Sequence, residues 1–169
     1  KKNNGKGYVV RQGILAASGD YILFMDADMA TPINQLPLFI DALNGGEDFA
    51  YAIRTHQKYD NKNRFLLGLG FLFLAHLLAL KKPVIDTQCG FKMFKKETAK
   101  FIFSKMRING GTFDIEIFLI AQKHNIKSRY ISVLWNAMPG STINIVKCVL
   151  FDPFDLLRIR IYEMLGFYR

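Results

Sequence analysis

The apolar run Tyr21-Ile22-Leu23-Phe24-Met25, followed by aspartates at positions 26 and 28, constrains the fold more than any other feature. Five consecutive apolar residues of strand length are typical of a β-strand buried on both faces. Open α/β sheets bind ligands beyond the carboxyl ends of such strands. Residues i and i+2 of an extended chain point to the same side, so Asp26 and Asp28 are expected to face one spot. Carboxylate oxygens suit Mg²⁺ or Mn²⁺, which makes the pair a candidate metal site.

Strand and helix signals alternate along the rest of the chain. A chain of 169 residues is expected to form one domain, and this alternation predicts an α/β layered fold. Strands are predicted at 21–25, 49–53, 91–94 and 129–135. Helices are predicted at 7–17, 35–43 and 97–106, from 112 to 125, and from 152 onward.

Two apolar segments lie outside this regular alternation. The run Phe65–Leu80 is shorter than the roughly 20 residues that a membrane-spanning helix needs, so it is either a membrane-docking helix or a buried helix. Asp152-Pro153 is a favourable helix start, with a cap followed by a first-turn proline. Residues 157–161 also alternate like a strand, but the cap favours a helix.

The composition indicates an anionic partner and some apolar surface. Lys and Arg total 23 against 14 Asp and Glu, a net charge of +9. Nucleotide phosphates, lipid phosphates and anionic headgroups all fit this balance. Nucleic acid fits less well, because the basic residues are scattered and no nucleic-acid-binding motif accompanies them. Half of the residues are hydrophobic, so part of the surface is expected to face a membrane or another part of the protein.

The segment Asp86-Thr87-Gln88-Cys89-Gly90-Phe91-Lys92 has no general physical signature beyond a turn that leads into a strand. It resembles the acceptor-side motif of dolichyl-phosphate glucosyltransferases, in the inverting GT-A family (glycosyltransferase family 2) that also holds polyprenyl-phosphate transferases. Further segments resemble motifs of that family in the same order along the chain. They are Asn4-Gly5-Lys6-Gly7, Asp26-Ala27-Asp28, Phe113-Asp114-Ile115-Glu116 and Trp135 with Gly140-Ser141.

The resemblance implies a GT-A fold that is incomplete at its N-terminus. Family members begin with a strand and with segments that bind uracil and ribose, and this chain opens after them. We therefore interpret residues 1–150 as the C-terminal portion of a GT-A catalytic domain. Residues 151–169 are interpreted as an amphipathic helix at a membrane interface.

The resemblance also implies roles for individual residues. Asp26 and Asp28 would hold Mg²⁺ or Mn²⁺ on the donor's diphosphate, and Arg54, unless it is only a solvated surface charge, would neutralise a phosphate. Glu116 is a weaker candidate than Asp114, because the two lie about 200° apart on a helix; it could face solvent or act as a cap. The catalytic candidates are Asp86, Asp114 and Arg54. The substrate-binding candidates are Lys6, Gln88, Gly90, Lys92, Trp135 and Ser141.

The expected reaction moves a hexose to a polyprenyl or dolichyl phosphate with inversion, and glucose from UDP-glucose is preferred to mannose from GDP-mannose. A phosphate acceptor is already largely dianionic at neutral pH and needs no general base. A glycan hydroxyl acceptor, the first alternative, would need one, with Asp86 or Asp114 as the candidate. The second alternative is a non-catalytic remnant that binds metal or membrane. The expected location is the cytoplasmic face of a membrane, and an oligomer is possible.

Overall fold

A mixed four-stranded sheet lies at the centre of the computed structural model, which describes residues 3–54, 62–136 and 145–169. The strand order is β1-β3-β2-β4. Strand β3 runs antiparallel to both β1 and β2, whereas β2 and β4 are parallel. The strands are β1 (Tyr21–Met25), β2 (Phe49–Arg54), β3 (Phe91–Lys95) and β4 (Ser128–Val133). The predicted α/β class is confirmed.

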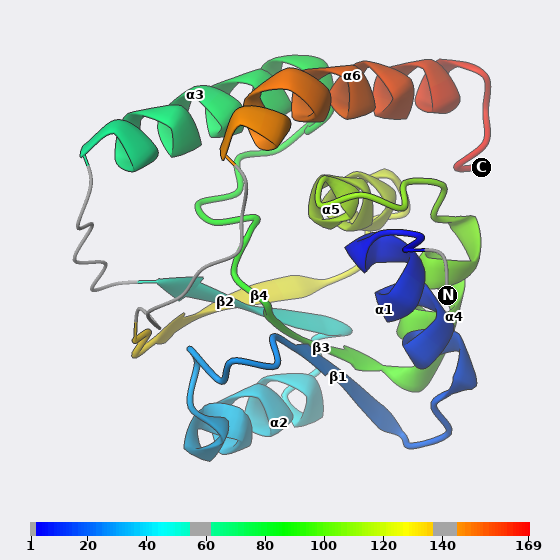
Figure 1. Cartoon of the computed structure of the whole chain (residues 1–169). Helices are drawn as coiled ribbons and strands as arrows, with labels where there is room; N and C mark the ends of the chain where they lie inside the picture. Colours follow the sequence, from blue (N-terminus) through cyan, green and yellow to red (C-terminus); the bar gives the residue numbers. More distant parts are fainter. Residues whose placement is uncertain (1–2, 55–61, 137–144) are drawn as a thin grey trace.

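Helices cover both faces of the sheet (Figure 1). Helix α2 lies on one face, and α1, α4 and α5 lie on the other. Helices α3 and α6 pack side by side in an outer layer beyond α5. The helices are α1 (Lys6–Ala16), α2 (Leu36–Asn44) with the short η1 (Ile33–Gln35) before it, α3 (Lys62–Leu78), α4 (Lys96–Lys105), α5 (Phe113–Lys123) and α6 (Ile145–Met164).

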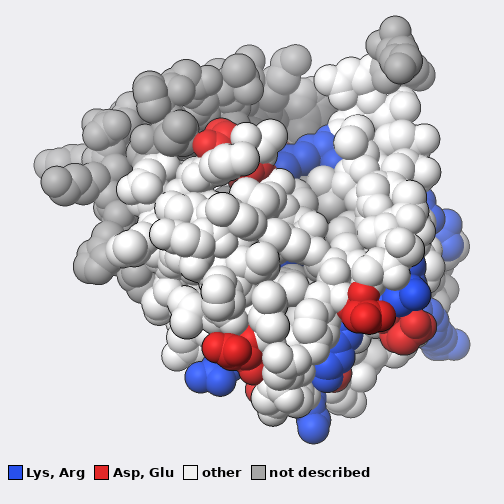
Figure 2. Space-filling model, turned by 90° about the horizontal axis from the view of Figure 1, so that it is seen from below, with Lys and Arg blue, Asp and Glu red and all other residues white. Residues whose placement is uncertain are grey.

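Helix α5 forms the centre of the larger of two apolar cores. All residues from Phe113 to Ala121 are buried, as expected of a helix that is apolar nearly all round. The smaller core lies between the sheet and α2, where Phe39 stacks at an angle on Phe91. Seen from below, on the side of α2, the molecule shows mostly uncharged atoms, with acidic and basic side chains nearer its margin (Figure 2).

Strand β1 departs from the prediction that it is buried on both faces. Ile22 and Phe24 are buried, whereas the alternate residues Tyr21, Leu23 and Met25 are only half-buried. The reason is its position at the edge of the described sheet, where it pairs with β3 alone. The second face of β1 therefore meets only the margin of the core under α2.

Helix α6 begins earlier than predicted. It starts at Ile145, so Pro153 lies inside the helix and Asp152 is not its cap. An interior proline removes one helical hydrogen bond and costs about 3 kcal/mol. The burial of Leu156 and Ile159 in the larger core offsets that cost. The helical interpretation of residues 157–161 is confirmed, and the boundary proposed between residues 150 and 151 falls within this continuous helix.

Helix α3 is buried on one side and exposed on the other, and the membrane-docking interpretation of Phe65–Leu80 stays a prediction. Ala75 and Ala79 are buried against the larger core, whereas Leu69, Phe73 and Leu77 are exposed on the outer side. The helix is therefore not buried all round. None of the helices in the described part of the chain combines the length and the hydrophobicity that a membrane-spanning helix requires.

Candidate active site at one edge of the sheet

The strand directions bring most of the predicted site residues to one edge of the sheet. Because β1 and β2 both run antiparallel to β3, their carboxyl ends lie at the same edge, and β4 ends there too. Asp26 follows β1, Arg54 ends β2 and Trp135 follows β4. The segment Asp86–Gly90 arrives at the same edge because β3 begins there. The carboxyl ends of strands are the usual ligand-binding edge of an α/β sheet.

Asp26 lies between α1 and the turn that precedes β3. Lys6 Nζ donates to Asp26 Oδ1 over 2.7 Å, and the Asp26 backbone N–H donates to the Gly90 carbonyl over 2.8 Å. A Cβ atom added at Gly90 would lie 2.0 Å from Asp26 Oδ2. Glycine is therefore required at position 90 for the Asp26 carboxylate to stay where it is.

Asp28 lies in a turn and not on a continuation of strand β1. The Met29 backbone N–H donates to the Asp26 carbonyl over 3.2 Å, and Met29 has a φ of 55°, so residues 26–29 form a turn. Asp28 Oδ1 accepts the Ala30 N–H over 3.1 Å, a local bond typical of aspartate in turns. The prediction that both side chains follow strand alternation is wrong, because the strand ends at Met25.

The Asp26–Asp28 turn still fits a hard divalent cation. Its donors are carboxylate oxygens, which suit Mg²⁺ and Mn²⁺. Among the described residues, no group of three or more His, Cys, Asp or Glu side chains could hold a metal. Mg²⁺ commonly binds through one or two carboxylates and completes its coordination with substrate phosphates and water. The predicted metal ligands are compatible with that pattern.

Arg54 and Asp86 form a bidentate ion pair at this edge. Arg54 Nε donates to Asp86 Oδ2 over 2.6 Å, and a terminal guanidinium nitrogen donates to Oδ1 over 2.9 Å. Burial alone would raise the pKa of Asp86, but the hydrogen bonds and the charge of Arg54 outweigh it and hold that pKa below its usual value. Asp86 is therefore an ionised, oriented carboxylate and poorly matched to a general base. The interpretation of Arg54 as merely a solvated surface charge is wrong.

Trp135 joins this pair from the segment that follows β4. The Arg54 guanidinium carbon lies 5.5 Å from the centre of the Trp135 ring, a cation–π distance. The Asn136 N–H donates to the Ala30 carbonyl over 2.8 Å, which holds the Trp135 segment beside the Asp26–Asp28 turn. Gln35, which sequence reasoning missed, pairs with both backbone groups of Leu134 and supports the same segment. Ser141 lies outside the described residues.

Gln88 carries an unsatisfied polar group. Its backbone N–H donates to Asp86 Oδ1 over 3.1 Å. Its side-chain Nε2 is buried and has no hydrogen-bond partner within the described part of the chain. Unpaired buried donors are rare in native proteins, and one next to an ionised carboxylate is suited to meet a ligand oxygen.

Lys92 and Asp114 lie beneath this edge and not on its surface. Lys92 Nζ donates to Asp114 Oδ1 over 2.6 Å and to the carbonyls of Thr87 and Cys89 over 3.1 and 2.8 Å. These three acceptors match the three N–H donors of an ammonium group. Burial raises the pKa of Asp114, and the Lys92 charge opposes that rise. The structure thus places two predicted site residues as supports of the 86–90 turn.

Glu116 points away from Asp114, as the helical angle predicted, but it does not face solvent. It is fully buried and accepts the backbone N–H groups of Arg107 and Ile108 over 2.8 and 2.9 Å. It also accepts the Tyr168 hydroxyl over 2.6 Å. The solvent-facing alternative is wrong, and no sequence signal pointed to Tyr168.

Comparison with known proteins identifies the class of fold. The glucosyl-3-phosphoglycerate synthase of Mycobacterium tuberculosis, solved with Mn²⁺, UDP-glucose and phosphoglyceric acid, superimposes with a TM-score of 0.67 at 17% identity. The match covers 92% of this chain and 54% of that one. The same enzyme solved with Mg²⁺ and UDP gives a TM-score of 0.63. The fold is that of GT-A glycosyltransferases, as predicted.

Sequence comparison identifies the family. Residues 1–103 match "Glycosyl transferase family 2", and the chain belongs to that family. The dolichyl-phosphate beta-glucosyltransferase of Dictyostelium discoideum is 35% identical over 100% of this chain and 54% of its own length. The human protein of that name is 35% identical over 99% and 55%, and that of Saccharomyces cerevisiae 32% over 99% and 55%. The chain thus spans about half the length of these relatives.

Proposed function

We propose that the protein containing this chain transfers glucose from UDP-glucose to dolichyl phosphate, with inversion and with the help of a divalent metal. One observation carries the proposal. An acidic turn with a lysine beside it and an oriented Arg54–Asp86 pair meet at one sheet edge. The similarity of the whole chain to dolichyl-phosphate glucosyltransferases supports the choice of sugar and acceptor.

In this proposal some site residues contact the diphosphate of the donor, and others contact the sugar or the acceptor. A metal held by Asp26 and Asp28 would supply electrostatic stabilisation of the departing diphosphate. The Lys6 ammonium adds positive charge at the same place. Asp86, kept ionised by Arg54, orients substrate hydroxyls, and Gln88 Nε2 donates to an acceptor or sugar oxygen.

The reaction needs no proton acceptor from the protein. The bond between the anomeric carbon and the diphosphate oxygen breaks as an oxygen of the lipid phosphate bonds to the opposite face of that carbon. The attacking oxygen belongs to a phosphate that is largely dianionic at neutral pH. The low pKa of Asp86 agrees with a positioning role and not with proton abstraction.

The test uses the full-length protein with radiolabelled UDP-glucose, GDP-mannose and two acceptors, dolichyl phosphate and a glycan. We expect glucosyl transfer to dolichyl phosphate, loss with EDTA, recovery with Mg²⁺ or Mn²⁺, and a β-linkage by NMR. The variant Asp28→Ala should abolish transfer, whereas Asp41→Ala, at an exposed position of α2, is the matched control. Transfer from GDP-mannose, or to the glycan alone, would reject the substrate assignment. Binding without any transfer would favour the non-catalytic remnant.

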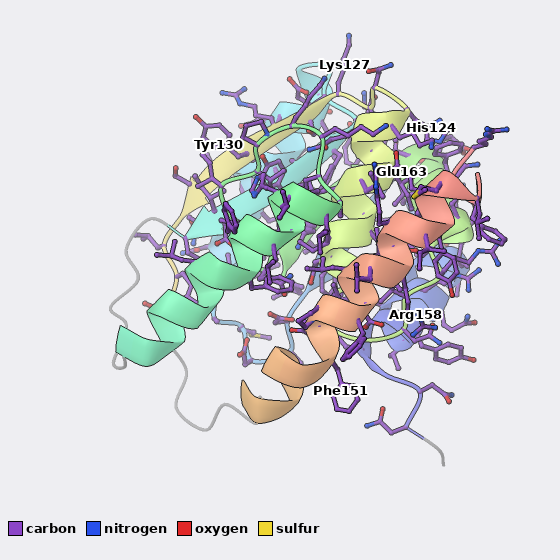
Figure 3. All side chains as sticks on the ribbon, turned by 90° about the horizontal axis from the view of Figure 1, so that it is seen from above. His124, Lys127, Tyr130, Phe151, Arg158 and Glu163 are labelled. Atoms are coloured by element: carbon purple, nitrogen blue, oxygen red, sulfur yellow. The ribbon has the colours of Figure 1, made fainter. Side chains whose placement is uncertain are left out.

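We also propose that the outer layer of α3 and α6 lies on the cytoplasmic face of a membrane. Leu69, Phe73 and Leu77 recur at four-residue spacing on α3 and are about half or more exposed. The corresponding exposed residues of α6 are Phe154, Leu157, Ile161 and Met164, and Leu165 directly follows them. Viewed from above, the two helices lie side by side (Figure 3). An exposed apolar surface of this extent is typical of an interaction site.

Charge favours a membrane as the occupant of this face. Arg160 and Lys81 lie beside the apolar residues, on either side of Glu163, over 2.6 and 2.9 Å. Arg158 comes from the same helix (Figure 3). Cations beside an apolar helix face are suited to anionic lipid headgroups.

Tryptophans introduced into the full-length protein test the membrane proposal. In vesicles containing anionic and brominated lipids, a tryptophan at Phe73 or Leu157 should be quenched. A tryptophan at Leu38, equally exposed but on α2 at the opposite face, is the control and should not be quenched. If none of the three is quenched, the remainder of the protein or a second copy covers this face, and the proposal is overturned.

A further inference from the structure

Glu116 is a buried carboxylate that the proposed reaction does not use. It receives three donors: the N–H groups of Arg107 and Ile108 and the hydroxyl of Tyr168. Burial raises its pKa, and these hydrogen bonds oppose the rise. A buried carboxylate with three well-formed hydrogen bonds fixes the backbone that supplies them. The backbone fixed here is the segment 107–110 between α4 and α5.

Tyr168 reaches Glu116 because the chain reverses after α6. Gly166 has a φ of 82°, a conformation that favours glycine, and the following residues turn back toward α4 and α5 (Figure 1). Tyr168 is fully buried, and its carbonyl bonds to His124 Nε2 over 2.7 Å. The Arg107 guanidinium carbon also lies 5.1 Å from the centre of the Phe167 ring. Residues 166–168 therefore hold the segment 107–110 from outside.

On its other side, the segment 107–110 contacts the start of α1 without intervening side chains. The Tyr8 N–H donates to the Asn109 carbonyl over 3.3 Å. A Cβ atom at Gly5 would lie 2.3 Å from the Asn109 oxygen, and one at Gly7 would lie 2.7 Å from the Ile108 oxygen. Both glycines are thus required for this backbone contact. Lys6 lies between them, so its place depends on the segment 107–110.

We propose that Glu116 and Tyr168 are positioning residues for Lys6. They fix the segment 107–110, which seats the start of α1 and so holds Lys6 Nζ 2.7 Å from Asp26 Oδ1. The link to catalysis rests on the proposed function, in which Lys6 and Asp26 meet the donor's diphosphate. Loss of the Tyr168 hydroxyl therefore weakens donor binding and leaves acceptor binding unchanged.

Donor kinetics of the full-length protein test this coupling. Tyr168→Phe should raise the KM for UDP-glucose about three- to tenfold and leave the KM for dolichyl phosphate unchanged. In a Lys6→Ala background the same change should have less than about a twofold effect, because coupled residues are non-additive. Where Lys6→Ala turns over too slowly, the dissociation constant for UDP-glucose replaces KM. Ile159→Val, a buried change on α6, is the stability control and should leave the donor KM unchanged.

Hydrogen exchange tests the network without relying on activity. Tyr168→Phe and Glu116→Gln should speed exchange at the amides of Arg107, Ile108 and Tyr8, and not in β1 or β3. Such a pattern in a protein that transfers no glucose would reject the proposed function and leave the network standing. Unchanged exchange at Tyr8, or a donor effect that persists fully in Lys6→Ala, would overturn the positioning role.

Discussion

Two carboxylate–cation pairs near the same edge of the sheet differ in their exposure and in the pKa of their carboxyl groups. Arg54–Asp86 is at the sheet edge, with side chains 21% and 13% exposed. Lys92–Asp114 lies beneath it, with side chains 1% and 3% exposed. The first pair lowers the pKa of its carboxyl, whereas burial raises that of the second. The two pairs therefore differ in accessibility. Arg54–Asp86 can contact substrate, whereas Lys92–Asp114 supports the 86–90 turn from beneath.

The largest expected effect comes from breaking the buried pair. Lys92→Met leaves Asp114 buried without its partner, so the free energy of unfolding should fall by about 3–5 kcal/mol. The double variant Lys92→Met/Asp114→Leu, which removes both charges, should recover much of that loss. Urea denaturation of the full-length variants measures both. A double variant no more stable than the single one would show that the hydrogen bonds to Thr87 and Cys89, and not the charge, dominate.

A smaller effect on stability is expected at the partly buried Arg54–Asp86 pair. Asp86→Asn keeps the shape of the side chain but removes its charge, so the free energy of unfolding should fall by about 1–2 kcal/mol. Glucosyl transfer should fall about tenfold, since a positioning group is weakened and no base is lost. Asp28→Ala should abolish transfer under the same conditions. If Asp86→Asn reduced transfer as completely as Asp28→Ala, Asp86 would act as more than a positioning carboxylate.

Gly90 lies between the turn that Lys92 supports and the Asp26 carboxylate. Gly90→Ala would place a Cβ atom 2.0 Å from Asp26 Oδ2, so that carboxylate must move. Because the end of a side chain moves easily, we expect a stability loss below about 1 kcal/mol but a several-fold weaker Mn²⁺ affinity. Titration of Mn²⁺ by electron paramagnetic resonance measures it, with Gly13→Ala, where a Cβ meets no atom within 4 Å, as control. Unchanged affinity would argue against Asp26 as a ligand.

The smallest effect is the dependence of stability on pH. A carboxyl whose pKa is lowered by folding binds fewer protons in the folded state than in the unfolded state. Asp86 therefore stabilises the folded protein at pH values above its usual pKa of 3.8, and this stabilisation is lost as the pH falls through the lowered pKa of the folded state. Asp114, with a raised pKa, has the opposite sign: its contribution is present at low pH and is lost as pH rises. Asp86→Asn should therefore flatten the acid loss of stability, which urea titrations from about pH 5 down to about pH 2 would measure. An unchanged acid slope would show that Asp86 does not set it.

Much of the fold could be predicted because its signals are local. The apolar run of β1 and its flanking turn residues gave limits that the structure reproduces, Tyr21–Met25. The predicted start of α6 at Asp152 is wrong, because the burial of Leu156 and Ile159 in a continuous helix outweighs the favourable local cap at Asp152. Likewise, the aspartate pair was assigned strand geometry, although a backbone hydrogen bond closes a turn there.

By itself, the sequence determined which residues follow the strands, since apolar periodicity, glycine positions and motif order are properties of neighbouring residues. Which of those polar side chains are exposed and which are buried depends on contacts between distant parts of the chain. Lys92 meets Asp114 from 22 positions away, and Glu116 meets Tyr168 from 52. The cost of burying a charge depends on partners that folding brings together, and no local pattern encodes such partners.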